Sequence, residues 1–96
     1  MKRKTQCVLS SSIFMTKQIE ATRYIKGLLT SRGINIESGI SLIGECDWQV
    51  FDYKRKCLAV DPNAGVWVGM AGSKWKTLGT CTVSSALQAV EFLTKE

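Results

Sequence analysis

The chain has 96 residues, of which 45% are hydrophobic, with 13 basic residues, eight acidic residues and no histidine. This length allows one hydrophobic core, so we expect a single domain over residues 1–96. Three of the positive charges, Lys2, Arg3 and Lys4, lie in residues 1–4, which we expect to form a disordered basic tail. The absence of histidine removes the usual general base and the commonest metal ligand. We therefore expect neither an enzyme nor a metal or cofactor site.

The same composition bears on where the protein works. No stretch approaches the roughly 20 apolar residues of a membrane span, and serines at 10–12 interrupt the apolar run after the first lysines. We therefore expect a cytoplasmic protein with no secretory signal and no membrane association. The cysteines at positions 7, 46, 57 and 81 have no CxxC spacing, so small buried hydrophobic residues are expected rather than zinc ligands. An enzyme working without histidine would use Cys57 or Cys81.

The N-terminal third predicts a short strand at residues 5–9 and then a helix from Ser12 or Thr16 to Arg32. The apolar stripe of this helix comprises Ala21, Tyr24, Ile25, Leu28 and Leu29. Residues 32–34, Arg-Gly-Ile, are typical of a helix end, because arginine suits the negative helix terminus and glycine adopts the left-handed conformation.

Short alternating apolar runs separated by turn residues predict a series of strands. Residues 34–43 form one strand, a small hairpin or an extended connection. The later runs are residues 48–51, 57–60, 66–70 and 74–78. A final helix is predicted from about Thr82 to Lys95, capped by Thr82 or Ser84. Together these elements predict an α+β two-layer sandwich, in which an antiparallel β-meander of four or five strands has an N-terminal and a C-terminal helix packed on one face.

Two basic clusters are the candidate functional residues. Lys54, Arg55 and Lys56 are expected at a hairpin tip, and Lys74 and Lys76 lie on the last strand. Basic residues interleaved with aromatic ones contact phosphates and stack on bases. Exposed turns and protected edge strands carry the same residue types for structural reasons alone, so each cluster also has an explanation that involves no ligand.

The faces of Trp67 and Trp75 depend on the connection between their strands. A two-residue loop at 72–73 would place Trp75 in the core and Trp67 on the opposite face, beside Lys74 and Lys76. A loop of odd length would place both tryptophans on one face, because a register shift of one residue reverses every side chain. Both arrangements leave at least one tryptophan on the side away from the core.

These features favour a small non-enzymatic module that binds nucleic acid through its basic turns and an exposed tryptophan. The candidate binding residues are Lys54, Arg55, Lys56, Trp67, Lys74, Trp75 and Lys76. The alternative is a small protein-binding module or inhibitor, of a phage or regulatory kind, that uses its sheet face or edge and also forms a homodimer. A contiguous basic face would favour nucleic acid, whereas scattered lysines beside an apolar sheet face would favour a protein partner.

Overall fold

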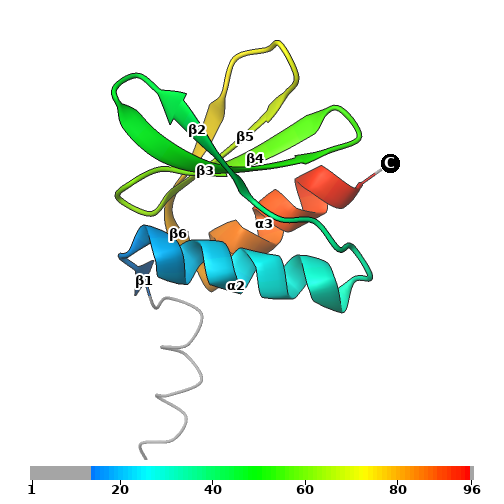
Figure 1. The fold of residues 1–96 in the computed structure, drawn as a ribbon. Coiled ribbons are helices and arrows are strands. Elements are labelled where there is room, and N and C mark those ends of the chain that lie inside the picture. The colour runs from blue at the N-terminus through cyan, green and yellow to red at the C-terminus, as the bar shows by residue number, and fades with distance from the viewer. Residues whose placement is uncertain (1–13, 96) are drawn as a thin grey trace, which may run out of the picture.

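The computed structural model describes residues 14–95, which form two helices and one antiparallel sheet of six strands (Figure 1). The elements are β1 (Phe14–Met15), α2 (Gln18–Ser31), β2 (Gly39–Ile43), β3 (Cys46–Tyr53), β4 (Lys56–Val60), β5 (Gly65–Met70), β6 (Lys76–Thr82) and α3 (Val83–Thr94). The strand order across the sheet is β1-β6-β5-β4-β3-β2. The predicted α+β class with an antiparallel sheet is confirmed, but the sheet has six strands rather than four or five.

The two outer strands account for the difference in strand number. β1 pairs with the end of β6 where a helix was predicted, and α2 begins only after Lys17, whose side chain makes no cap hydrogen bond. The predicted helix start at Ser12 is therefore wrong, whereas the alternative start at about Thr16 lies one residue before the observed N-cap, Lys17. The ambiguous residues 34–43 contain one strand, β2, which pairs with β3. The predicted strand at residues 5–9 and the basic tail lie outside the described residues.

The C-terminus of α2 has the predicted glycine stop. Gly33 adopts a φ of +80°, the left-handed conformation that only glycine enters without steric strain. Its N–H donates to the carbonyl of Thr30, and the N–H of Ile34 donates to the carbonyl of Leu29, both at 2.9 Å. This pair of bonds is a Schellman motif, so the local sequence ends the helix without help from the rest of the fold.

Helix α3 starts directly at the end of β6, through a capping box. The hydroxyl of Thr82 accepts from the N–H of Ser85 at 3.1 Å, and the hydroxyl of Ser85 accepts from the N–H of Thr82 at 2.8 Å. The buried Ser85 hydroxyl also donates to the carbonyl of Thr80 at 3.0 Å. Of the two predicted caps, Thr82 and Ser84, the structure has Thr82, and the capping box turns the chain from the end of β6 onto the sheet face.

Both helices lie on one side of the curled sheet (Figure 1). Helix α3 packs against β4, β5 and β6, and α2 packs mainly against α3 and β4. The largest fully buried side chains are Phe51, Ile25, Leu29, Leu58, Leu93, Val60, Val66, Val90 and Cys81. They come from both helices and the middle strands, so the core lies between the helices and the sheet.

A β-bulge in β6 changes which of its side chains face the helices. Trp67 pairs with Thr77, whereas the preceding residue, Val66, pairs with Gly79, so Leu78 is the extra residue in β6. A bulge bends its strand and increases the local twist. It therefore contributes to the curl of the sheet, and it leaves Leu78 packed against the core.

The loop between β4 and β5 is ordered by a single carboxylate. One oxygen of Asp61 accepts from the backbone N–H groups of Asn63 and Gly65, both at 2.8 Å. The other oxygen accepts from the indole N–H of Trp67 at 3.0 Å. The Asp61 side chain thus holds both the loop backbone and the orientation of one tryptophan.

Replacing Asp61 by alanine should lower the free energy of unfolding by about 2–3 kcal/mol, because part-buried donors lose a charged acceptor. Urea denaturation monitored by circular dichroism measures this change. The exposed Asn63 contributes only its backbone N–H to this network, so Asn63→Ala is the control and should keep wild-type stability. An Asp61→Ala variant as stable as the control would contradict the structural role of the carboxylate.

Candidate functional site

The two basic clusters lie at the same end of the sheet. The turn between β3 and β4 is Lys54-Arg55, as predicted, and the longer connection between β5 and β6 stands beside it. Lys56 pairs with Met70 across the two hairpins, and the N–H of Ala71 donates to the carbonyl of Arg55 at 2.9 Å. Positions that are well separated in the sequence therefore become neighbours.

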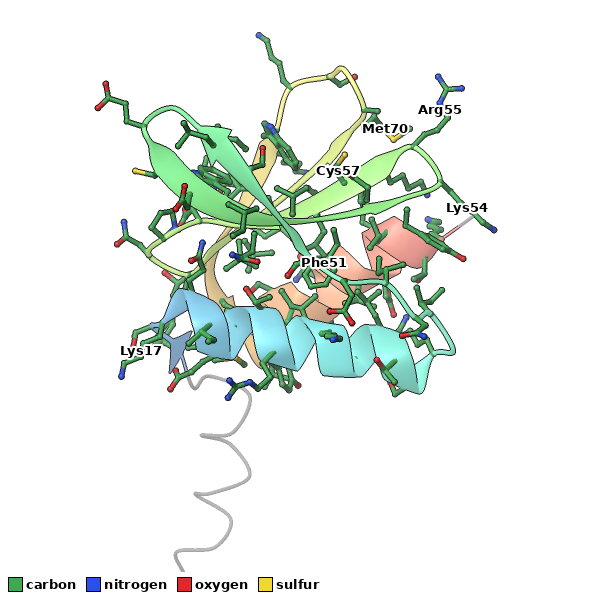
Figure 2. All side chains as sticks on the ribbon, in the orientation of Figure 1. Lys17, Phe51, Lys54, Arg55, Cys57 and Met70 are labelled. Carbon is green, nitrogen blue, oxygen red and sulfur yellow. The ribbon has the colours of Figure 1, made fainter. Side chains whose placement is uncertain are left out.

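We call this region the basic end. It comprises Lys54, Arg55, Lys56, Lys74, Lys76 and Lys95. Lys95 joins it from the end of α3, because the ammonium group of Lys56 donates to the Lys95 carbonyl. In Figure 2 the side chains of Lys54 and Arg55 point away from the body of the protein, with Met70 beside the same turn.

The backbone at the hairpin tip is unusual for the residues that occupy it. Lys54 has a φ of +49° and Arg55 a φ of +72°, the positive values that a two-residue type I′ turn requires. Such turns favour Asn-Gly, because a left-handed conformation costs other residues about 1–2 kcal/mol each. Both side chains are exposed, and the ammonium group of Lys54 lies 5.3 Å from the centre of the neighbouring Tyr53 ring.

Charge is distributed unevenly along the strand direction. Glu45, Asp47 and Asp61 lie in or beside the connections at the other end of β3 and β4, whereas Asp52 lies near the basic end, where it accepts from the Cys57 thiol. Among residues 14–95 the one ion pair joins Lys26 to Glu37 at 2.6 Å, which leaves the basic end without a carboxylate partner in the described part of the chain. Its positive charge is therefore available to an anionic ligand.

Lys56 differs from the other members of the basic end. It is half-buried, its ammonium group lies 5.4 Å from the centre of the Phe92 ring, and it donates to the Lys95 carbonyl. A cation at the C-terminus of a helix interacts favourably with the helix dipole. These contacts hold α3 against the β3–β4 hairpin through Lys56.

An apolar hollow of about 350 Å³ opens between α3 and the β5–β6 hairpin, next to the basic end. We call it the α3 hollow. It is lined by Val68, Gly69, Met70, Ser73, Lys74, Lys76, Leu78, Gln88 and Phe92. Lys76 stands directly opposite the buried Val68, so its side chain starts on the helix side of the sheet. The sequence did not indicate this hollow, because its walls come from three separate elements.

All three tryptophans gather on the face of the sheet that the helices leave open. The ring centre of Trp48 lies 5.5 Å from that of Trp67 and 6.5 Å from that of Trp75. The connection from Met70 to Lys76 contains five residues, an odd number, so Trp75 shares a face with Trp67. The two-residue loop is therefore wrong, and so is the placement of Trp67 beside Lys76.

Close packing explains the position of the Trp75 ring. A Cβ atom at Gly69 would lie 3.4 Å from the ring and 3.2 Å from the carbonyl of Lys74, so a glycine leaves room for both. The sequence reasoning missed the part of Trp48 in this cluster. The odd spacing of three residues between Trp48 and the apolar Phe51 was the signal for it, because it places the two side chains on opposite faces of β3.

The cysteines have different environments. Cys81 is buried, as predicted, whereas Cys46 is exposed and Cys57 is half-buried, so burial was predicted correctly for only one of the three described cysteines. Burial raises the pKa of Cys81 from 9.0 to about 11. Burial, followed by the hydrogen bond to Asp52 and the charge of that carboxylate, raises the pKa of Cys57 to about 11. Both thiols are therefore protonated near neutral pH, a state that disfavours nucleophilic chemistry.

Residues 14–95 contain neither a metal-binding cluster nor a membrane-spanning helix. Within that range no three metal-ligating side chains lie close enough to hold a metal ion. Neither helix there combines the length and the apolar character that crossing a membrane requires. No protein-family model, no curated protein and no solved structure matches this chain. The arguments about function therefore depend on the geometry and charge of its own residues.

The thiol of Cys57 offers a test of the open face. Its sulfur donates to Asp52 at 2.9 Å, so Asp52→Asn should lower the pKa of Cys57 and increase its rate of alkylation by iodoacetamide at a pH near 9. In the protein with its native carboxylate, the rate should rise about tenfold per pH unit below the pKa, because the thiolate is the reacting species. Every sample carries Cys7→Ser, Cys46→Ala and Cys81→Ala, so that Cys57 is the thiol that reacts. The variant Asp47→Asn is the control. Equal rates in the two asparagine variants would contradict the Asp52 contact.

Proposed function

We propose that this protein binds nucleic acid through the phosphate backbone, with Lys54, Arg55, Lys74 and Lys76 as the contacts. The supporting observation is that the two basic clusters, separate in the sequence, lie together at one end of the sheet. Cations without carboxylate partners release bound counterions from nucleic acid, which supplies most of the free energy of non-specific binding.

The strained hairpin tip supports the same function. Lys54 and Arg55 occupy left-handed backbone positions where Asn-Gly would be more stable. Strained backbone geometry is concentrated at functional sites, where the residue type serves something other than stability. At this tip the property that Lys and Arg supply, and that Asn and Gly lack, is positive charge.

Three expectations from the amino-acid sequence remain predictions. They are the stacking of bases on Trp67 and Trp75, the contribution of a basic arm at residues 2–4, and a cytoplasmic location. The two rings lie on the open face with Trp48, away from the side from which Lys76 extends. The proposed phosphate contacts do not require them.

The double variant Lys54→Asn/Arg55→Gly tests the function without sacrificing stability. The Asn-Gly turn should raise the free energy of unfolding by about 0.5–2 kcal/mol. Loss of two phosphate contacts should weaken nucleic-acid binding roughly 25- to 60-fold at about 0.1 M salt. The log–log salt slope for a single strand should change from about −3 to about −1.5. Fluorescence anisotropy of a labelled oligonucleotide gives both affinity and slope.

Lys17→Asn/Arg23→Gln is the matched control, because it removes the same charge from α2. Lys17 precedes Gln18, which donates to the Asp47 carbonyl at 3.0 Å, so it lies near the opposite end of the sheet from Lys54 (Figure 2). Asparagine at this N-cap also favours the helix. The control should retain most of the affinity. Equal loss in both double variants would show that net charge, rather than the basic end, determines binding.

The edge strand β2 favours a second candidate function, a protein-binding module or inhibitor that also forms a homodimer. Ile40 and Leu42 are 72% and 68% exposed, and β2 carries neither the lysine nor the proline that usually protects a free edge. An unprotected edge pairs readily with another strand.

This second function predicts self-association that depends on β2. Sedimentation velocity should then show a dimer that Ile40→Lys converts to a monomer, because a charge would disturb the paired edge. Leu87 on α3 is also exposed, so Leu87→Lys is the control and should remain dimeric. A monomeric wild-type protein over the concentration range of the binding assays would count against the homodimer.

A further inference from the structure

The α3 hollow combines an apolar interior with a cationic rim. Val68 and Leu78 of the sheet and Phe92 of α3 contribute apolar surface, while Lys74 and Lys76 stand at its edge. Its volume of about 350 Å³ lies within the range of small-ligand pockets, about 300–1,000 Å³. Such a site suits a ligand that is flat or apolar in one part and anionic in the adjoining part.

One polar group in the hollow is suited to recognition. The amide nitrogen of Gln88 donates to the hydroxyl of Ser84 at 3.3 Å. Its carbonyl oxygen has no partner in the described part of the chain, and a side-chain amide has a second N–H to donate. Gln88 is exposed on α3, so it can present a donor and an acceptor to the edge of a planar ligand.

We infer that the α3 hollow takes one unpaired base of a nucleic-acid strand whose adjoining phosphates contact Lys74 and Lys76. This inference rests on the proposed function, and it adds a preference for single strands. In a duplex the bases are stacked and paired, so placing one in the hollow would require flipping it out at a cost of a few kcal/mol. Single-stranded nucleic acid offers the base directly, beside an aromatic side chain.

Charge complementarity selects this occupant. The rim carries Lys74 and Lys76, and the tip with Lys54 and Arg55 adjoins it through the bond between Ala71 and Arg55. A strand with its base in the hollow would thus have positive charge for the phosphates on both sides. A single anionic amphiphile would use the rim but would have no phosphate for the tip.

The test compares strands that share phosphates but differ in bases. The probes are a labelled deoxythymidine strand of about ten nucleotides, the same length of abasic phosphodiester, and a duplex of that length, a size within the footprint of small single-strand modules. We expect the thymidine strand to bind roughly 5- to 100-fold more tightly than the abasic strand. We also expect it to bind more tightly than the duplex, and all three affinities should fall with salt.

A variant that fills the hollow gives a second readout. Gln88→Trp covers the hollow without changing charge, and Gln88→Ala, which leaves the hollow open, is the comparison. Position 88 is exposed, and circular dichroism checks that each variant is folded. The tryptophan variant should bind thymidine and abasic strands with nearly equal affinity, while it retains the affinity of the wild type for the abasic strand. The alanine variant loses the amide contacts but leaves the hollow open, so it should keep a reduced preference for the strand with bases.

The outcomes separate the two proposals. Equal, salt-dependent binding of thymidine and abasic strands by the wild type would overturn the base site and leave the proposed function standing. No binding of any strand would overturn both. Stronger competition by decyl phosphate than by thymidine 5′-phosphate would assign the hollow to an acyl chain, and would also overturn the inference.

Discussion

The register of β5 between β4 and β6 determines which side chains reach the helices. It places Val66 and Val68 opposite Val60 and Leu58, and this row of buried residues packs beneath α3. Because neighbouring side chains in a strand point to opposite faces, the same register turns Trp67 toward the open face. The bulge at Leu78 and the five-residue connection before Lys76 then determine which side chains of β6 face the helices and which face the open side.

The two faces of the sheet consequently differ in character. On the open face two carboxylates accept from neighbouring side chains: Asp61 accepts from Trp67, and Asp52 accepts from Cys57. The tryptophan rings pack together there, which makes that face a second, smaller packed layer. The helix side, by contrast, ends in the α3 hollow and its lysines. The features suited to a ligand therefore lie at one end of the helix side, apart from the tryptophans.

The basic end combines rigid support with exposed charge. Lys56 joins the β3–β4 hairpin to the end of α3, and the bond from Ala71 to Arg55 joins the two hairpins. These contacts hold the backbone of both connections, while the side chains of Lys54 and Arg55 remain in solvent. Charges on a fixed framework bind a polyanion with less loss of conformational freedom than charges on a flexible tail.

Elements with local signals could be predicted from the amino-acid sequence. The glycine stop at Gly33, the cap at Thr82, the Lys54-Arg55 turn and the α+β class all follow from residues within a few positions of one another. The sequence also indicated most of the basic end as separate clusters. Four features could not be read from the sequence: the meeting of these clusters, the extension of the sheet by β1 and β2, the shared face of the tryptophans, and the hollow beside Lys76. Those features depend on pairing between distant segments, where one extra residue in a connection or a bulge reverses the face of every following side chain.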